Sequence, residues 1–97
     1  MKVIWARHAR NRLEEIQEFI GRDLGIHASD FCERLIDQTD RLEAHPFRGP
    51  TLPEDPAYRQ LVVDEYRIVY RVAEDAVYVL TIVAPGMSYE NAIQHAV

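Results

Sequence analysis

The fold of this chain is decided by one stretch, residues 58–86, which reads YRQLVVDEYRIVYRVAEDAVYVLTIVAPG. Large apolar residues occupy every second position of its middle part: Tyr66, Ile68, Tyr70 and Val72. This period of two is typical of a strand whose two faces differ. Asp64-Glu65 and Glu74-Asp75 separate that strand from the apolar runs on either side and predict tight turns. The stretch therefore predicts an antiparallel meander with strands over residues 58–63, 66–72 and 77–83.

The last predicted strand differs from the middle one, because residues 77–83 are apolar almost without interruption. Both of its faces are therefore expected to be buried, which is typical of a strand inside a sheet. Pro85-Gly86 ends the run, and Ser88 is a suitable cap for a short tail helix. The residues expected on one face of this helix are Tyr89, Ala92, Ile93 and Ala96.

Upstream of the meander, the apolar residues follow a helical period. Two stripes recur at helical spacings: Ala9, Leu13, Ile16 and Ile20, and then Ala28, Phe31, Leu35 and Leu42. Gly25 is expected to end the first helix, because glycine readily adopts the left-handed conformation found at helix ends. Ser29 or Asp30 is expected to cap the second helix. That helix should end near His45, because Pro46 disfavours helical geometry in the residue before it. The stripes predict an antiparallel helical hairpin.

Short segments at either end of the hairpin complete the pattern. Val3-Ile4-Trp5 is an apolar run typical of a first strand. Four prolines and Gly49 make residues 46–56 a loop. Helices that precede a run of strands indicate an α+β fold. We therefore expect one domain over residues 1–97, with an N-terminal strand and an antiparallel helical hairpin packed on a mostly antiparallel sheet that ends in the three-stranded meander and a short tail helix.

The composition favours a soluble, cytoplasmic protein. A chain of 97 residues can bury one core without a metal or a disulfide. Cys32 is the only cysteine, so no internal disulfide can form and a cytoplasmic location is expected. No apolar run approaches the length of a membrane span, so no membrane partner is expected. The formal net charge of −5 argues against general affinity for nucleic acids, because binding to phosphates needs a surplus of Lys and Arg.

The residue types that usually carry chemistry do not form a recognisable site. The histidines show no ligand spacing, so neither a metal nor another cofactor is expected; they are His8, His27, His45 and His95. Cys32 is interpreted as a small buried helix residue rather than as a reactive thiol. The acidic residues lie in predicted turns and on polar helix faces, where solvation is the simplest interpretation. No catalytic residue is predicted from these patterns.

Arginines form the most suggestive pattern for binding. Arg67 and Arg71 lie four residues apart on the middle predicted strand and so project from one face, with Arg59 on the neighbouring strand. Guanidinium groups on a sheet suit bidentate capture of phosphate or carboxylate, although pairing with the protein's own carboxylates explains them as well. A second basic group lies near the start of the first predicted helix: Arg7, Arg10 and Arg12. Positive charge there opposes the helix dipole, which is a further indication of a binding role.

Several pieces of the chain, with the spacings between them, match one group of proteins. The opening pieces are Val3-Ile4-Trp5, Ala9, Leu13, Ile16 and Phe19-Ile20, followed by Phe31 and Leu35. The helix end and the loop are matched by Leu42, His45-Pro46 and Gly49. The most recognisable pieces are Arg59, Leu61, Tyr66-Arg67-Ile68 and Tyr70-Arg71-Val72, and the last strand is matched by Asp75, Val77 and Val79-Leu80. In this order they resemble the ParE/RelE superfamily, the toxin halves of type II toxin–antitoxin pairs.

The two branches of this superfamily differ in their targets. RelE-type members cleave mRNA in the ribosome with several basic residues and a C-terminal tyrosine, whereas the characterised ParE-type members poison DNA gyrase. Arg67 fits the central-strand arginine of the nucleases, but Tyr58 and Gln60 stand at the positions of their lysines. Pro85-Gly86-Met87 stands near the position of a further arginine, and Ile93 near that of the tyrosine. The resemblance is therefore closer to the ParE branch, and we expect no enzymatic activity.

The resemblance implies a toxin of the plasmid-stabilisation type that acts on DNA gyrase, does not bind nucleic acid directly and is neutralised by a cognate antitoxin. Two alternatives remain open: a RelE-like mRNA endonuclease with a degenerate site, and a non-toxic interaction module of the same fold. Tyr89, one helical turn before the expected tyrosine position, joins the arginines as a candidate for target or antitoxin binding; the full set is Arg7, Arg10, Arg59, Arg67, Arg71 and Tyr89. An antitoxin segment is expected to bind across the helical hairpin and an exposed sheet edge, because an unpaired edge accepts an added strand.

Overall fold

The computed structural model describes residues 1–24, 28–94 and 96. The expected helix stop at Gly25 and the histidines at 27 and 95 fall outside the described residues, as do the side chains of Ala28 and Ser29. Ser29 or Asp30 was expected to cap the second helix, but that helix already begins at Ala28, so both residues lie inside its first turn.

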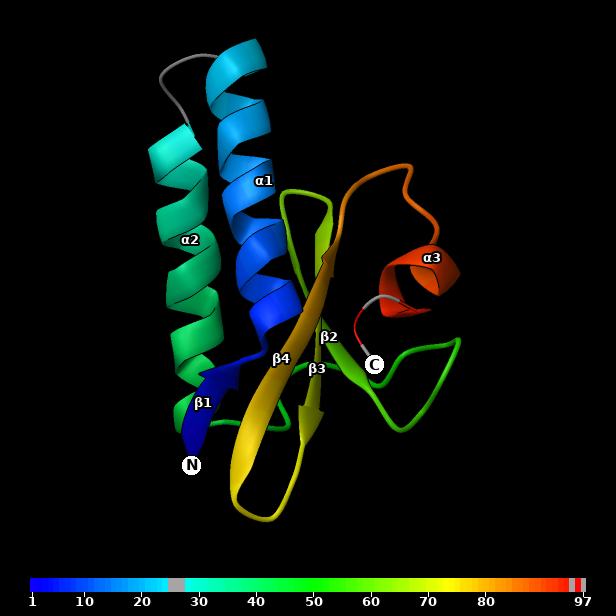
Figure 1. Ribbon diagram of the computed structural model, residues 1–97. Helices are drawn as coiled ribbons and strands as arrows, with labels where there is room; N and C mark the ends of the chain where they lie inside the picture. Colours follow the sequence, from blue (N-terminus) through cyan, green and yellow to red (C-terminus); the bar gives the residue numbers. More distant parts are fainter. Residues whose placement is uncertain (25–27, 95, 97) are drawn as a thin grey trace.

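The elements follow the predicted order (Figure 1). They are β1 (Lys2–Trp5), α1 (Arg7–Leu24), α2 (Ala28–Asp40), a short 3-10 helix η1 (Arg41–Glu43), β2 (Arg59–Val63), β3 (Tyr66–Val72), β4 (Ala76–Val83) and α3 (Tyr89–Gln94). The second helix was expected to end near His45; its regular part stops at Asp40 and continues as η1 to Glu43, so only its last turn is tighter than predicted. The α+β fold is confirmed.

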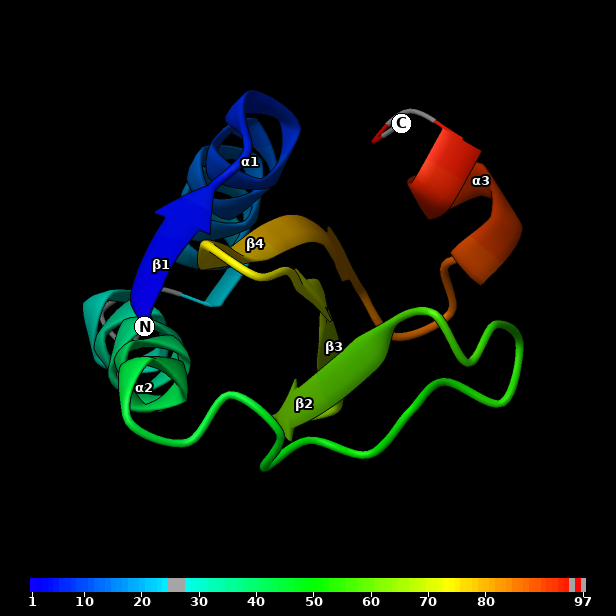
Figure 2. The same cartoon turned by 90° about the horizontal axis from the view of Figure 1, so that it is seen from below.

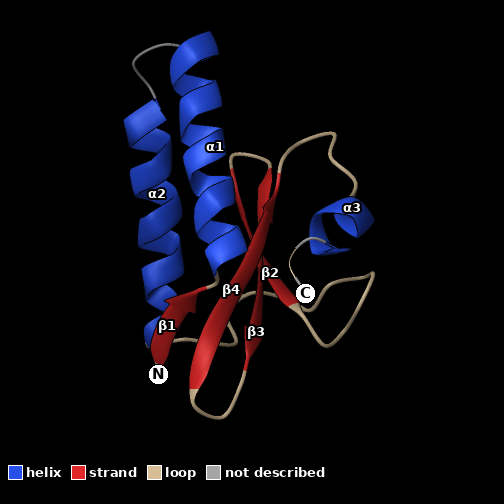
Figure 3. Ribbon diagram, in the orientation of Figure 1, coloured by secondary structure: helices blue, strands red, loops and turns tan. Residues whose placement is uncertain are grey.

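The sheet has four strands in the order β1-β4-β3-β2 (Figure 3). The predicted meander is confirmed, because β2 pairs antiparallel with β3 and β3 pairs antiparallel with β4. β1 adds to the far side of β4 in parallel, with Val3 opposite Val77. This places β4 inside the sheet, which explains its continuous apolar run. β1 and β2 form the two edges.

The turn between β2 and β3 has the geometry of a tight hairpin. Asp64 and Glu65 both have positive φ, at 49° and 71°. Two successive left-handed residues match the right-handed twist of the flanking strands, which is why two-residue hairpin loops favour this conformation. Arg34 of α2 pairs with Asp64, so the helix layer is tied to the end of this hairpin.

The main core lies between the helical hairpin and one face of the sheet. Its buried members are Ala9, Ile16, Ile20, Phe31, Cys32, Leu35, Leu42, Leu61, Val63, Ile68, Tyr70, Val77, Val79 and Ile82. Both predicted helix stripes contribute, and Leu35 is fully buried as expected. α1 packs over β4 and α2 over β2, so the hairpin covers the width of the sheet.

A second, smaller cluster covers part of the opposite face of the sheet. Figure 2 shows α3 on the side of the sheet away from α1 and α2. The cluster consists of Leu52, Val69, Val83, Tyr89 and Ala92, with Tyr58 and Ile93 packed against it. The tail helix begins as predicted, because the Asn91 amide donates to the Ser88 hydroxyl at 3.3 Å. The loop before β2 and the tail helix therefore share one cluster on the outer face of the sheet.

An irregularity in β4 changes which of its side chains face the helices. Val69 lies opposite Thr81, but the next residue, Tyr70, lies opposite Val79, so Leu80 is an additional residue in β4. Because of this bulge, Val79 and Ile82 both reach the main core although they are three positions apart. Thr81 is fully buried and lies beside α1, where it meets the side chain of His8 at 3.0 Å.

Candidate binding surfaces

Arg67 lies on the outer face of the sheet, near the start of β3, and is held by the protein's own groups. Its guanidinium donates to both carboxylate oxygens of Glu54, at 2.9 and 3.0 Å, and its Nε donates to Gln60 at 2.5 Å. The guanidinium also lies 5.5 Å from the centre of the Tyr89 ring. The hydrogen bonds from Arg67 lower the pKa of Glu54, and the same bonds raise the pKa of Arg67. The protein's own carboxylate therefore fills the bidentate site that the sequence offered to a ligand.

Arg59 does not share a surface with the other two strand arginines. It lies opposite Tyr70 in the sheet register, whose ring is part of the main core, so Arg59 projects from the helix-covered face. Arg67 and Arg71 project from the outer face, as their spacing predicted. Arg59 donates to the carbonyl of Gly49 at 2.8 Å and its guanidinium lies 5.0 Å from the Phe47 ring. Its contacts fasten the loop that precedes β2.

The same loop explains why Gly49 is a glycine. Its amide donates at 3.0 Å to the hydroxyl of Tyr70, whose pKa is raised by burial. A Cβ added at Gly49 would lie 2.2 Å from the carbonyl oxygen of Gln60 and 2.8 Å from that hydroxyl. The loop is therefore held against β2 and β3 too closely for any side chain at this position.

Arg71 lies near the other end of the outer face. Its guanidinium is 5.3 Å from the centre of the Tyr78 ring, and the Tyr78 hydroxyl donates to Asp75 at 2.8 Å. This hydrogen bond raises the pKa of Tyr78. Arg71 is exposed, and none of the ion pairs found among the described residues includes it. It is therefore an accessible cation beside an aromatic ring.

Tyr89 is buried rather than displayed on the surface. It is 8% exposed and packs in the second cluster beneath Arg67, and burial raises its pKa. Tyr89 is therefore engaged in the fold of the free protein, and its contact with a target or an antitoxin stays a prediction. Its ring helps to hold the tail helix on the sheet.

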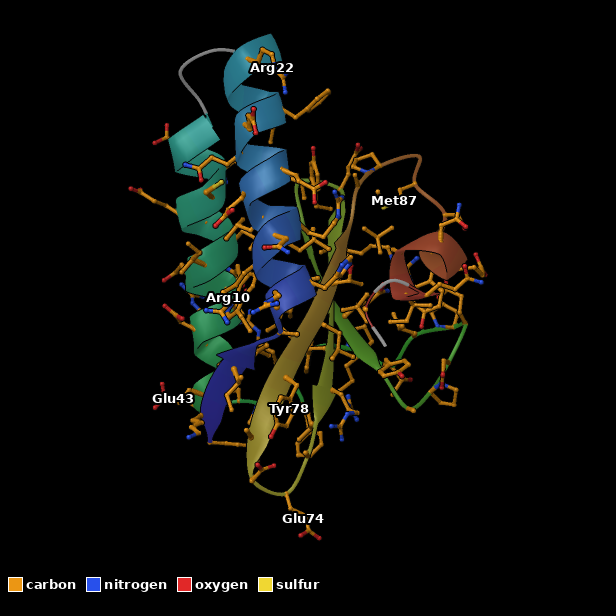
Figure 4. The ribbon with its side chains drawn as sticks, viewed as in Figure 1. Arg10, Arg22, Glu43, Glu74, Tyr78 and Met87 are labelled. Carbon is orange, nitrogen blue, oxygen red and sulfur yellow. The ribbon has the colours of Figure 1, made fainter. Side chains whose placement is uncertain are left out.

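Arg7 and Arg10 are exposed on the first turn of α1, which carries no acidic residue. Neither takes part in an ion pair within the described part of the chain. At 100° per residue, both lie well away from the side of α1 that carries His8 and Arg12. Figure 4 labels Arg10 and Met87 on opposite sides of the α1 ribbon. Arg7 and Arg10 are thus available for contact, but on a surface of their own.

A groove that the sequence patterns did not predict lies between α1 and residues 84–92. Two adjoining hollows of about 500 Å³ and 830 Å³ form it, and they share Arg12, Glu15 and Met87 as lining residues. The first hollow is also lined by Ile16, Phe19, Tyr66, Ala84 and Pro85, and the second by His8, Asn91 and Ala92. We call this surface the α1–tail groove.

One stripe of α1 forms a wall of this groove. His8, Arg12, Glu15 and Phe19 follow one another at spacings of four, three and four, next to the core stripe that begins at Ala9. Phe19 is 52% exposed and Met87, on the opposite wall, is 39% exposed. The sequence contained this second stripe as a helical spacing, but its mixture of aromatic, acidic and basic residues resembles an ordinary solvated helix face.

Arg12 is the most constrained side chain of the groove. It is only 12% exposed, and its Nε donates to the carbonyl of Ile82 at 3.1 Å. Its Nη1 donates to Glu15 at 3.3 Å, and its Nη2 has the sulfur of Met87 at 3.8 Å as acceptor. A thioether is a weak acceptor, so this mostly buried side chain turns its least satisfied end towards the groove. Arg12 belongs to the basic group at the start of the first predicted helix, but it was not among the predicted binding residues.

The remaining residues that could carry chemistry are the single cysteine and the possible metal ligands. Cys32 is buried in the main core, and desolvation raises the pKa of its thiol. Within residues 1–24, 28–94 and 96, no cluster of His, Cys, Asp and Glu is arranged to hold a metal ion. None of the described helices has the length and apolar character that a membrane span requires.

Comparison with known proteins places the sequence in a family and shows which solved structures share its fold. The chain matches the family model of the ParE toxin of the type II toxin–antitoxin system parDE over residues 3–89. No curated protein matches in sequence. The fold resembles a chain of the chromosomal ParDE toxin–antitoxin system from P. aeruginosa, with 23% identity, a TM-score of 0.73, and coverage of 84% of this chain and 92% of that one.

Two further solved structures share the fold. The toxin–antitoxin complex RelBE2 from Mycobacterium tuberculosis gives a TM-score of 0.62 at 18% identity, with coverage of 86% of this chain and 88% of that chain. A doubly substituted E. coli toxin RelE in the free state gives a TM-score of 0.69 at 16% identity, with coverage of 99% of this chain and 97% of that chain. Similarity to both branches shows the common fold, and the family model covers most of the sequence. This chain therefore belongs to the ParE toxin family of type II toxin–antitoxin systems.

Proposed function

We propose that this toxin acts in the ParE manner, by inhibiting DNA gyrase, and that a cognate antitoxin neutralises it. The observation that carries the proposal is the match to the ParE family model over residues 3–89. The solved ParDE system with the same fold is described as a toxin–antitoxin pair, which supports a protein partner for this chain as well.

The surroundings of Arg67 support a mode of action other than RNA cleavage. Arg67 is the residue that fits a nuclease arginine, and its donors are occupied by Glu54 and Gln60. Stabilising the charge that develops during phosphoryl transfer needs several positioned cations, acids or bases. Tyr58 and Gln60 supply no positive charge on the neighbouring strand. An anionic phosphate at this place would also have to displace the Glu54 carboxylate.

The sheet edges support the binding of an antitoxin segment. The first half of β2 is already covered, because Gln60 donates to Pro50 at 3.0 Å and Leu52 donates to Tyr58 at 2.9 Å. Backbone direction alternates along a strand, so the amide and carbonyl of Val62 also point outwards, beyond the covering loop. Val62 is 62% exposed, and a shallow hollow joins it to Arg34 on α2. An added strand at Val62 would therefore lie beside the helical hairpin, as expected for the antitoxin.

The experiment compares the two candidate targets directly. The purified chain is added to DNA gyrase with relaxed plasmid, and separately to ribosomes translating a defined mRNA. We expect inhibition of supercoiling, relief of that inhibition by the protein that the neighbouring gene encodes, and intact mRNA. Codon-dependent mRNA cleavage that Arg67→Ala abolishes would instead establish the RelE-like alternative. Absence of both activities and of growth arrest on induced expression would leave a non-toxic interaction module.

A further inference from the structure

We propose that the α1–tail groove binds an acidic amphipathic segment of the antitoxin, with a carboxylate on Arg12 and an apolar side chain between Phe19 and Met87. This inference rests on the proposed toxin–antitoxin function and specifies where a part of the partner docks. It is independent of strand addition at Val62, because the groove lies on the other side of α1 from α2.

The hydrogen-bonding state of Arg12 indicates the chemistry of the occupant. Its Nη2 is left with the Met87 sulfur at 3.8 Å, while its side chain is 12% exposed. A charge-assisted bond from a guanidinium to a carboxylate is far stronger than one to a thioether. An incoming carboxylate at Nη2 would give this mostly buried guanidinium side chain the strong hydrogen-bond acceptor that Nη2 lacks. The bond from Nε to Ile82 fixes the guanidinium in place, so little side-chain entropy is lost on binding.

The apolar end of the groove indicates that the occupant also carries an apolar side chain. Phe19 and Met87 are 52% and 39% exposed and line the same hollow with Pro85. Gly86 has a φ of 83°, a backbone conformation that residues with a side chain rarely adopt. The turn at Gly86 directs Met87 back towards α1, where its sulfur meets Arg12. Exposed aromatic and methionine side chains around one cavity are typical of adaptable protein-binding sites.

The charges around the groove favour a peptide over a nucleic acid. Glu15 forms part of the rim and is 65% exposed, and the chain carries a net charge of −5. The several phosphates of a nucleic acid would be repelled by Glu15 and by this negative net charge. A single carboxylate can bind Arg12 at Nη2, beside the Glu15 that is bonded to Nη1, and the rest of the segment is then apolar. This arrangement matches the charge of an amphipathic peptide with one or two acids on its apolar side.

The test measures binding of the purified chain to the protein encoded by the gene next to its own, by the dissociation rate and by equilibrium titration. Phe19→Ala and Met87→Ala should each weaken the complex by about tenfold or more, since truncation of a central apolar anchor commonly has that effect. Both side chains are partly exposed, so these variants should fold like the parent. Phe47→Ala, in a phenylalanine that is 62% exposed on the loop before β2, is the control and should bind like the parent.

A second pair of variants tests the role of charge with the opposite sign. Glu15→Gln removes the carboxylate that now competes for Arg12, so binding should become tighter, by about threefold to tenfold. Glu18→Gln is the matched control, because it removes the same charge from the same helix at a residue paired with Arg22 and not with Arg12. It should change binding by less than about twofold.

The outcomes separate the groove from the wider function. A complex that forms normally while the Phe19, Met87 and Glu15 variants all bind like the parent would overturn the groove proposal and leave the toxin–antitoxin function intact. Equal tightening by Glu15→Gln and Glu18→Gln would show general electrostatics and would also contradict an Arg12 contact. A parent chain that forms no complex would overturn both.

Discussion

Truncation of Leu35 measures how much the helical hairpin contributes to the fold. Leu35 lies in α2, is fully buried, and belongs to the main core together with Phe31 and Ile68. Leu35→Ala removes three carbon atoms, which corresponds to about 2.4 kcal/mol at roughly 0.8 kcal/mol for each buried carbon. The cavity left behind adds to this loss, so we expect the free energy of unfolding to fall by about 3–4 kcal/mol.

The assay is chemical and thermal unfolding followed by circular dichroism. For a domain of this size, about 4–8 °C of melting temperature corresponds to 1 kcal/mol, so the expected decrease is roughly 12–30 °C. Ile36→Ala is the control in the neighbouring residue, which is 41% exposed, and it should cost less than about 1 kcal/mol. A similar loss in both variants, or a loss below about 1 kcal/mol at Leu35, would mean that the hairpin does not pack on the sheet as described.

Two further predictions concern the loop before β2 and the outer face of the sheet. Gly49→Ala places a Cβ 2.2 Å from the Gln60 carbonyl and should cost about 2–4 kcal/mol in urea unfolding, because the loop must move and leave the buried Tyr70 hydroxyl without its donor. Gly86→Ala meets no atom within 4 Å and should cost only about 1–2 kcal/mol through its φ of 83°; an equal or larger loss there would contradict the close approach at Gly49. The Arg67–Glu54 pair predicts a pH dependence, because the pKa of Glu54 is lowered in the folded state. Its stabilisation is fully present above the unfolded carboxyl pKa of about 4.3 and is lost as the pH falls through the lower folded value. The difference in melting temperature between the parent and Glu54→Gln should therefore be widest near neutral pH and shrink below about pH 4, and a difference that stays constant down to about pH 2 would argue against the pair.

The sequence predicted the elements and their order because the patterns that define them are local. The period of two around Ile68, the helical stripes and the turn at Asp64-Glu65 are each set by a few neighbouring residues. The apolar run of β4 predicted a strand with both faces buried, and the sheet order confirms it. Among the candidate binding residues, the shared face of Arg67 and Arg71 followed from the same local alternation.

The tertiary structure decided what depends on distant residues. The parallel pairing of β1 with β4 and the bulge at Leu80 are choices of register between segments far apart in the sequence. Register also places Arg59 opposite the core residue Tyr70, on the other face from Arg67. Pairing with Glu54 decides that Arg67 is engaged, and the packing of α3 decides that Tyr89 is buried.

The α1–tail groove also depends partly on a local sequence pattern and partly on tertiary packing. The stripe from His8 to Phe19 is visible in the sequence, but its partners lie at the opposite end of the chain. Arg12 bonds to Ile82 and reaches Met87, which are 70 and 75 residues away. A helical period shows which side chains share a face of one helix and says nothing of the segment that meets that face. Only packing of the chain on itself brings the guanidinium, the thioether and the exposed phenylalanine to one surface.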